Sequence, residues 1–166
     1  MRELLLDIRN ERLSFFTPAG EVKALNDVSI QLYKGDVLGI VGESGSGKSV
    51  TAYSIMQLLP QNAKIIGGTI DFNGHRINDM TEEDMRKIRG NEVSIIFQDP
   101  MTSLNPVYTI GNQIIEVIML HTNKTRKEAL ERAEELLALV GINEPKKRLK
   151  QYPHELSGGM RQRVMI

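Results

Sequence analysis

Apolar and polar residues alternate along the first part of the chain, in the two-residue period of a half-buried β-strand. Val28, Ile30 and Leu32 follow this period and indicate one apolar sheet face. Turn residues cluster at positions 18–20 and 34–36. Three short strands are predicted, at residues 4–9, 12–16 and 21–32. The N-terminal part of the chain is therefore predicted to be a β layer.

The next part of the chain mixes both kinds of element. A helix is predicted to run from a glycine-rich segment to about Leu59, directly before a proline. Residues 67–74 predict a strand that an Asn-Gly turn closes, and residues 93–97 predict a buried strand. Thr81 and Asp84 have the spacing of a capping box, which predicts that a short helix begins there.

Beyond Pro106 the apolar residues recur every three or four positions, which is the spacing of one helix face. Helices are predicted at residues 110–120 and 125–140. Thr125 and Glu128 form a second capping-box pattern, and Gly141 is placed to end the helix that they begin. We therefore expect this part of the chain to be helical.

A glycine-rich segment, Gly42–Ser49, lies between the apolar run at residues 37–41, which predicts a strand, and the helix that follows. Its G-x-x-x-x-G-K-S spacing is typical of a phosphate-binding loop. Glycines let backbone N–H groups approach phosphate oxygens, Lys48 supplies charge to the β- and γ-phosphates, and Ser49 offers a hydroxyl to Mg²⁺. The alternative is a glycine-rich turn with an accidental Lys-Ser pair, and the surrounding pattern disfavours it. The segment predicts a site for a nucleoside triphosphate.

Composition narrows the function classes. The 21 basic and 21 acidic residues cancel, so the charge does not favour a nucleic-acid partner. Cysteine is absent, which excludes a disulfide framework and a thiolate metal site. No apolar run approaches the roughly 20 residues of a membrane-spanning helix, and the first residues do not have the pattern of a signal peptide. We expect a soluble protein, or one that reaches a membrane through a partner.

Two further motifs could serve the same site. Gln98 follows the predicted strand at 93–97, where its amide oxygen could coordinate Mg²⁺ or orient the attacking water. Taken alone, a loop glutamine is more often a solvated turn residue. In a Leu-Ser-Gly-Gly motif, Ser157 is predicted to be an N-cap, while Gly158 and Gly159 leave backbone N–H groups open to an anion. Taken alone, this motif could also be a flexible helix boundary.

Together, these three motifs resemble the ATP-binding-cassette (ABC) family of transport ATPases. The runs at residues 94–106 and 152–164 are similar to ATPase subunits of dipeptide and oligopeptide importers in particular. The resemblance covers essentially the whole chain. It implies an α/β fold in which residues 1–99 form an N-terminal antiparallel β layer and a P-loop NTPase core. Residues 100–160 would form an α-helical subdomain with the Leu-Ser-Gly-Gly motif, and the C-terminal part of the fold would be absent.

The resemblance also implies which residues bind Mg·ATP. Lys48 and Gln98 would be catalytic, and Ser49 and Gln98 would hold Mg²⁺. Val50 stands where the family commonly has Thr or Ser, so it could contact the α-phosphate only through its backbone N–H. The implied nucleotide-binding residues are Phe15, Gly42, Ser44, Gly45, Ser46, Gly47, Lys48, Ser49, Val50, Ser157 and Gly159.

For the adenine, the resemblance implies an aromatic residue upstream of the loop, and this position corresponds to Phe15. Phe16 is the neighbour that could replace it. Adjacent strand residues point to opposite faces, so one ring can pack in the core while the other stacks on a base. The alternative is that both rings only pack against the protein.

The family resemblance implies partners as well. Transmembrane permease subunits would bind the protein at the cytoplasmic face of the membrane, so that its membrane contact is through partners only. A second cassette subunit would face the first head to tail, so that Ser157 and Gly159 complete the ATP site of the other copy. Exposed apolar residues after Gln98 could receive a helix of the permease, or they could close the core of the helical subdomain. These residues are Met101, Leu104, Val107 and Tyr108.

The family's acidic strand after the Leu-Ser-Gly-Gly helix, which supports Mg²⁺ and activates water, is not in this sequence. We therefore expect ATP binding without appreciable hydrolysis by this chain alone. Two alternatives to a peptide-importer ATPase stay open. One is a nonhydrolytic nucleotide-dependent interaction module, and the other is a cassette ATPase of a nontransport system such as DNA repair.

Overall fold

The computed structural model describes residues 2–97 and 103–166. Its contacts divide the chain into two compact units, Met1–Val93 and Ser94–Ile166. The glycine-rich loop belongs to the first unit and the Leu-Ser-Gly-Gly motif to the second. Gln98 and Met101, which the sequence analysis singled out, lie outside the described residues.

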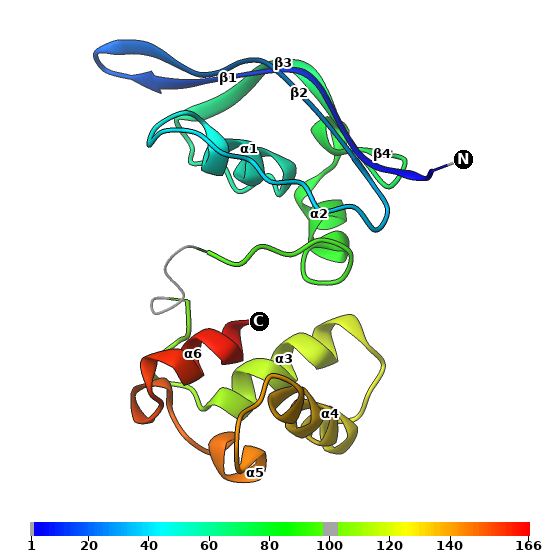
Figure 1. Cartoon of the computed structure of the whole chain (residues 1–166), viewed down its shortest axis with the longest axis vertical. Coiled ribbons are helices and arrows are strands. Elements are labelled where there is room, and N and C mark those ends of the chain that lie inside the picture. Colours follow the sequence, from blue (N-terminus) through cyan, green and yellow to red (C-terminus); the bar gives the residue numbers. More distant parts are fainter. Residues whose placement is uncertain (1, 98–102) are drawn as a thin grey trace. The chain divides into compact units, whose positions relative to one another are not determined.

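An antiparallel four-stranded sheet forms the frame of the first unit, with the strand order β2-β1-β3-β4 (Figure 1). The strands are β1 (Leu4–Thr17), β2 (Gly20–Tyr33), β3 (Ala63–Phe72) and β4 (His75–Arg76). The predicted strands at 4–9 and 12–16 are one strand, in which Asn10 has a left-handed φ of 49° and the pairing register shifts. Such a bulge bends a strand without ending it, so the polar residues that suggested a break lie within β1.

Local signals specify the turn and the helices of the first unit. Asn73 and Gly74 have φ values of 48° and 82°, as a tight hairpin turn between β3 and β4 requires. The helical elements are α1 (Lys48–Ile55), the 3₁₀ turn η1 (Ile77–Asp79) and α2 (Glu82–Ile88). Thr81 and Asp84 make the reciprocal bonds of a capping box at the start of α2, which confirms the sequence prediction.

Apolar side chains bury one face of this sheet. Leu6 and Ile8 of β1, with Ile70 of β3, pack against Ile77 and Met85 from η1 and α2. The partly buried Ile55 of α1 joins the same cluster. A second, smaller cluster lies further along the sheet and consists of Leu13, Leu25 and Ala63, with partly buried neighbours around it. The helices of the first unit are therefore held against the sheet by burial of apolar surface.

Three sequence predictions between residues 37 and 97 differ from the structure. Residues 37–41 form no strand, and Val37 and Val41 are 98% and 93% exposed. Residues 93–97 form no buried strand either; Val93 makes one isolated bridge and Phe97 is 40% exposed. A strand exists only through pairing with a neighbour, and neither run pairs along its length within the described part of the chain. The third difference is that α1 ends at Ile55 rather than near Leu59, because Gln57 turns left-handed with a φ of 49°.

The second unit is helical, as predicted. Its helices are α3 (Ile110–His121), α4 (Arg126–Leu139), α5 (Pro145–Arg148), the 3₁₀ turn η3 (Pro153–Glu155) and α6 (Gly158–Met165). Thr125 and Glu128 form the predicted capping box at the start of α4. At its other end Gly141, with a φ of 72°, closes α4 in the left-handed conformation that glycine favours.

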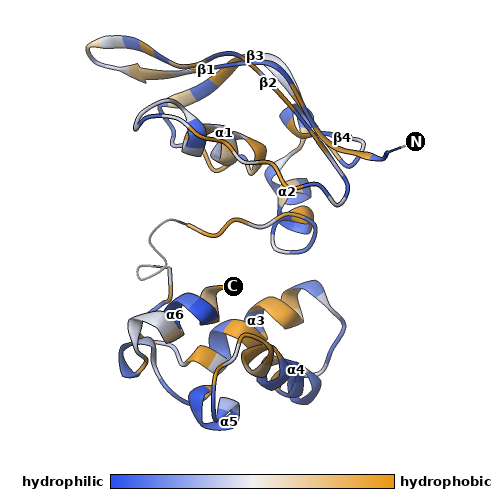
Figure 2. Ribbon diagram, viewed as in Figure 1, coloured by the Kyte–Doolittle hydropathy of each residue, from blue (hydrophilic) through white to orange (hydrophobic). Residues whose placement is uncertain are grey.

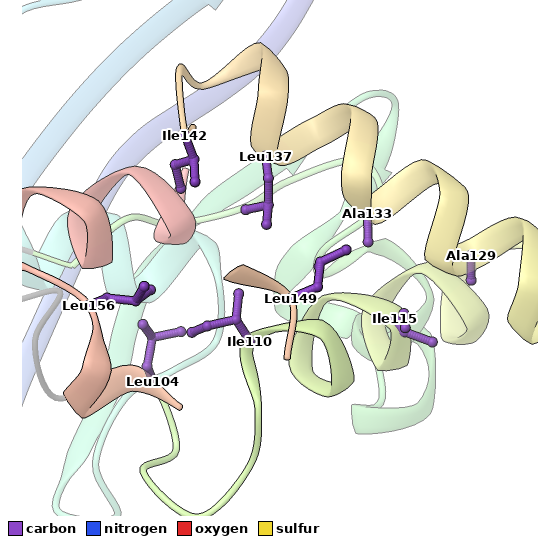
Figure 3. Close-up of a cluster of buried hydrophobic side chains, with 9 residues drawn as sticks. All are labelled: Leu104, Ile110, Ile115, Ala129, Ala133, Leu137, Ile142, Leu149 and Leu156. Atoms are coloured by element: carbon purple, nitrogen blue, oxygen red, sulfur yellow. The ribbon is translucent and has the colours of Figure 1, made fainter. Parts of the chain in front are cut away.

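The core of this unit is built from several short segments. Figure 3 shows Leu104, Ile110 and Leu156 directed toward one another, with Leu137 above them from α4. Hydropathy differs between the helices, since α3 is mostly hydrophobic whereas α4 carries long hydrophilic stretches (Figure 2). Within the described residues, no helix has the length and apolar character needed to cross a membrane.

Candidate functional site

The glycine-rich loop reaches α1 through two left-handed residues. Gly45 and Gly47 have φ values of 82° and 94°, which side chains other than glycine adopt only with strain. Space is limited as well. A Cβ at Gly47 would lie 2.6 Å from Cδ2 of Leu25, and a Cβ at Gly42 would lie 2.7 Å from Oγ of Ser46. The loop path therefore requires glycine at 47 for two independent reasons.

The loop curls around the ammonium group of Lys48. Its Nζ donates to the carbonyl oxygens of Gly42 at 2.8 Å and Glu43 at 2.7 Å, and lies 3.4 Å from Oγ of Ser46. These contacts hold a positive charge at the centre of the loop. Phosphate oxygens are stronger acceptors for an ammonium than neutral carbonyls are, so the same charge is available to an anion in the loop.

The N-terminus of α1 is open to an anion. Its N-cap is Gly47, which has no side chain to accept from the first N–H groups of the helix, and its first turn contains no acidic residue. Thr51 is buried and fixes the turn, because its backbone N–H and its hydroxyl both donate to the Gly47 carbonyl, at 2.9 and 3.1 Å. Ser49 is exposed beside Lys48. Free N–H groups, a lysine and the positive end of a helix dipole fit a phosphate group.

Beneath this helix, the small apolar cluster of Leu13, Leu25 and Ala63 connects the loop to the sheet. Both Phe15 and Val50 pack against that cluster, so the structure brings these two predicted site residues to one place. Leu25 was not predicted from the sequence to support this loop. Its apolar character is the only sequence signal that could have suggested this role.

The two phenylalanine rings have different surroundings. Phe15 is half-buried, whereas its neighbour Phe16 is 44% exposed. The ammonium of Lys64 lies over the Phe16 ring, 5.9 Å from the ring centroid.

Ser157 caps α6 in the second unit, as predicted. Its Oγ accepts from the Met160 N–H at 3.3 Å. Gly158 and Gly159 border open space, since a Cβ at either would meet no atom within 4 Å. Arg163 holds the other side of this turn, because its Nε donates to the Gly159 carbonyl at 3.3 Å. Ser157 and Gly159 are both exposed, so the helix start at this motif is uncovered among the described residues.

The segment before α3 divides the residues that the sequence analysis grouped as a docking loop. Leu104 is buried in the helical core, at 9% exposure. Val107 and Tyr108 are 70% and 54% exposed. Gln113 holds the segment in place, because its side chain accepts from the Asn105 N–H at 2.9 Å and donates to the Tyr108 carbonyl at 3.0 Å. Leu104 therefore closes the core of the helical unit, as one of the two alternatives stated. Val107 and Tyr108 do not, because they are exposed.

The chain is similar to known proteins over nearly its whole length. The family model described as ABC transporter matches residues 25–166. A probable peptide ABC transporter ATP-binding protein of Sinorhizobium fredii is 52% identical over 165 residues, covering 99% of this chain and 49% of the relative. The oligopeptide transport ATP-binding protein OppD of Escherichia coli is 51% identical over 164 residues, covering 99% and 48%. The chain thus spans about half the length of the curated relatives that it matches.

The fold comparison agrees. A bacterial ABC transporter cassette solved as a dimer superposes with a TM-score of 0.84 at 26% sequence identity, covering 98% of this chain and 67% of the other. The expected α/β cassette fold is confirmed, with the remaining third of the cassette outside this sequence. The matched residues include both the glycine-rich loop and the Leu-Ser-Gly-Gly motif described above. The chain therefore belongs to the ABC transporter family.

Proposed function

We propose that this chain is the ATP-binding part of a peptide importer, which couples the binding and hydrolysis of Mg·ATP to transport through membrane subunits. The observation that carries the proposal is the pair of loop carbonyls, from Gly42 and Glu43, that accept from the Lys48 ammonium beside a helix N-terminus that has no side-chain cap. The names of the relatives support the peptide substrate, since they are called peptide and oligopeptide transport ATP-binding proteins.

In this proposal the first unit holds the triphosphate. Lys48 leaves the Gly42 and Glu43 carbonyls to pair with the β- and γ-phosphates, while loop N–H groups from Gly45 to Val50 donate to the remaining oxygens. Ser44 and Ser46 extend the same loop. The Ser49 hydroxyl and the Gln98 amide oxygen are the proposed Mg²⁺ ligands, and the metal would neutralise charge on the phosphates. Phe15 would offer one ring to the adenine.

A second copy completes the proposed assembly. Ser157 and Gly159 are exposed at the start of α6, so a partner's triphosphate could reach the N–H groups there. The dimeric arrangement of the similar cassette supports this pairing. Val107 and Tyr108 are proposed to contact a permease subunit, which would place the protein at the cytoplasmic face of a membrane through that partner.

The test of the proposal is calorimetric titration of ATP, with and without Mg²⁺, into the 166-residue chain and its Lys48→Ala variant. We expect saturable binding by the parent and a loss of at least about tenfold in affinity for the variant, since a charge-assisted contact to phosphate is removed. Lys23→Ala is the matched control, because Lys23 is exposed on β2 outside the loop. Absence of binding by a folded parent chain, or equal binding by Lys48→Ala, would reject the site.

A further inference from the structure

The C-terminal end of α1 is held in an unusual way. The backbone N–H of Leu58 donates to the Tyr53 carbonyl at 2.9 Å, and the N–H of Gln57 donates to the Ser54 carbonyl at 3.1 Å. These two bonds are the Schellman pattern, which places the residue after the C-cap in the left-handed conformation. That residue is Gln57, with a φ of 49°. At the equivalent position of α4 the chain has Gly141.

A glutamine in this conformation carries strain of about 1–2 kcal/mol that a glycine would not. Such a conformation persists only where surrounding groups enforce it. Here the Gln57 side-chain amide donates to the Ile77 carbonyl of η1, and the guanidinium of Arg89 reaches the same helix end from α2. Contacts from two other elements therefore fix the end of α1.

Arg89 makes the larger set of these contacts. Its Nε donates to the Met56 carbonyl at 2.8 Å and its Nη2 donates to the Gln57 carbonyl at 3.2 Å. Its Nη1 donates to the Glu82 carboxylate at 2.8 Å, and this bond orients the guanidinium. The Arg89 side chain is only 18% exposed, so its bonds to the two carbonyls are partly shielded from water. It satisfies carbonyls at the helix end and puts a cation at the negative end of the helix dipole.

The other end of the same helix is the phosphate site. The eight residues of α1 place Lys48 and Gly47 about 12 Å from the carbonyls that Arg89 holds. A helix this short is marginal in isolation and depends on what fixes its ends. A rotation or fraying of α1 would displace the Lys48 ammonium and the N–H groups that face the loop. Its N-terminus has no side-chain cap at Gly47, so we expect the position of α1 to depend more on the contacts at its C-terminal end.

We propose that Arg89 is a positioning residue for triphosphate binding: by fixing the left-handed C-terminal end of α1, it holds the opposite end of that helix in the geometry that receives phosphate. This inference rests on the proposed function, since Arg89 would support the proposed phosphate site from the opposite end of α1. Arg89 touches no phosphate in this arrangement and acts only through the helix.

The test measures the affinity of the 166-residue chain for ATP and for inorganic pyrophosphate, a probe that needs only the phosphate loop. We expect Arg89→Met to weaken both by about tenfold. The matched control is Arg86→Met, which removes an exposed cation from the same helix whose ion pair with Glu82 is longer, at 3.6 Å. Arg86→Met is expected to bind both ligands as the parent does.

A rescue separates positioning from a general loss of stability. Adding Gln57→Gly to Arg89→Met removes the backbone strain that Arg89 offsets, so we expect affinity for pyrophosphate to recover at least threefold. If circular dichroism shows Arg89→Met to be unfolded, Arg89→Lys replaces it, because it keeps one cationic donor; it is expected to bind with intermediate affinity and to respond to the same rescue.

The results that would overturn the inference are distinct from those that would reject the proposed function. Parent-like affinity of folded Arg89→Met, or weakened affinity that Gln57→Gly leaves unchanged, would overturn the role of Arg89 while leaving the ATP site intact. Failure of the folded parent chain to bind either ligand would reject both. If Arg89→Met lowers the melting temperature but leaves the affinity unchanged, Arg89 stabilises the fold and does not position the phosphate site.

Discussion

Gly47 is the residue at which backbone conformation and packing restrict the phosphate loop together. Gly45 shares its left-handed φ but borders open space, so the two glycines separate the two effects. We expect Gly45→Ala to cost about 1–2 kcal/mol of unfolding free energy from strain alone. Gly47→Ala is expected to cost more, because its Cβ would also meet Leu25 at 2.6 Å and the Ala24 carbonyl at 3.1 Å. Urea unfolding monitored by circular dichroism checks the difference, and equal losses would contradict it.

Glu11 is a buried carboxyl that the sequence did not single out. It is fully buried in β1, and neither of its oxygens has a hydrogen-bond partner within residues 2–97 and 103–166. Burial raises the pKa of this carboxyl, and the nearby Ser54 hydroxyl opposes that rise. The folded protein therefore retains the proton to higher pH than the unfolded chain does. Stability from this group is present below its ordinary pKa of 4.5 and is lost as the pH rises through the raised value.

Replacing this carboxyl should stabilise the protein. We expect Glu11→Leu to gain about 1–3 kcal/mol of unfolding free energy at pH 8, because an unsatisfied buried polar group is removed. The gain should shrink toward pH 4, where the parent carboxyl is protonated in both states. Glu21→Leu, at an exposed position of β2, is the control. Urea unfolding at a series of pH values gives the answer, and a gain that does not change with pH would contradict the explanation.

At the scale of an element, α4 shows how a helix end is specified locally. Thr125 accepts from the Glu128 N–H, while the Glu128 carboxylate accepts from the Thr125 N–H at 2.7 Å and from its hydroxyl at 2.6 Å. These bonds to Thr125 lower the pKa of Glu128. Stability from the lowered pKa is present above the ordinary value of 4.5 and is lost as the pH falls through the folded-state value.

We expect Thr125→Ala to destabilise the helical unit by about 1 kcal/mol at pH 7, since a threonine N-cap is removed. The difference from the parent should narrow as the pH falls from 4.5 through the lowered pKa of Glu128, because the parent capping box is itself weakened there. Lys127→Ala, at an exposed position of α4, is the control. Hydrogen exchange of the first turn of α4 measures the effect where it occurs. Unchanged exchange there would show that tertiary packing, and not the cap, fixes this end.

The start and the end of a helix differ in how far they can be predicted. The capping boxes of α2 and α4 were predicted from residues three positions apart and are confirmed. The Ser157 cap of α6 was predicted from the Leu-Ser-Gly-Gly motif and is also confirmed. The end of α1 was predicted about four residues too late. Nothing local marks Gln57 as a left-handed residue, because its conformation is imposed by Arg89 and η1 from elsewhere in the chain.

At the scale of the whole molecule, two units with separate cores carry separate proposed tasks. Tyr108 is 54% exposed in the helical unit, outside the phosphate loop. We expect Tyr108→Ser to leave the affinity for ATP unchanged and to weaken association with a permease subunit about tenfold, because an exposed aromatic side chain is a typical interface anchor. Copurification with the permease measures it. Lys127→Ser, at an exposed position of α4, is the control, and equal retention of both variants would reject docking at Tyr108.

The sequence by itself determined what depends on near neighbours. Glycines at fixed spacing before Lys48 specify the loop, caps three residues apart specify helix starts, and an Asn-Gly pair specifies the hairpin, because each rests on bonds or backbone conformations within a few residues. The family followed from the same motifs. The strand prediction at 37–41 was wrong because an apolar run does not show whether a partner strand is present.

Only the tertiary structure decided the rest. It showed Glu11 buried without a hydrogen-bond partner among the described residues, packed Phe15 and Val50 against the same apolar cluster, and brought Arg89, directly after α2, to the end of α1. These arrangements join residues that are distant in sequence, and their free energies depend on burial and on how the helices and strands pack against one another. No local pattern encodes them. The glycine-rich loop was therefore readable in the sequence, whereas the contacts of Arg89 with the end of the following helix were not.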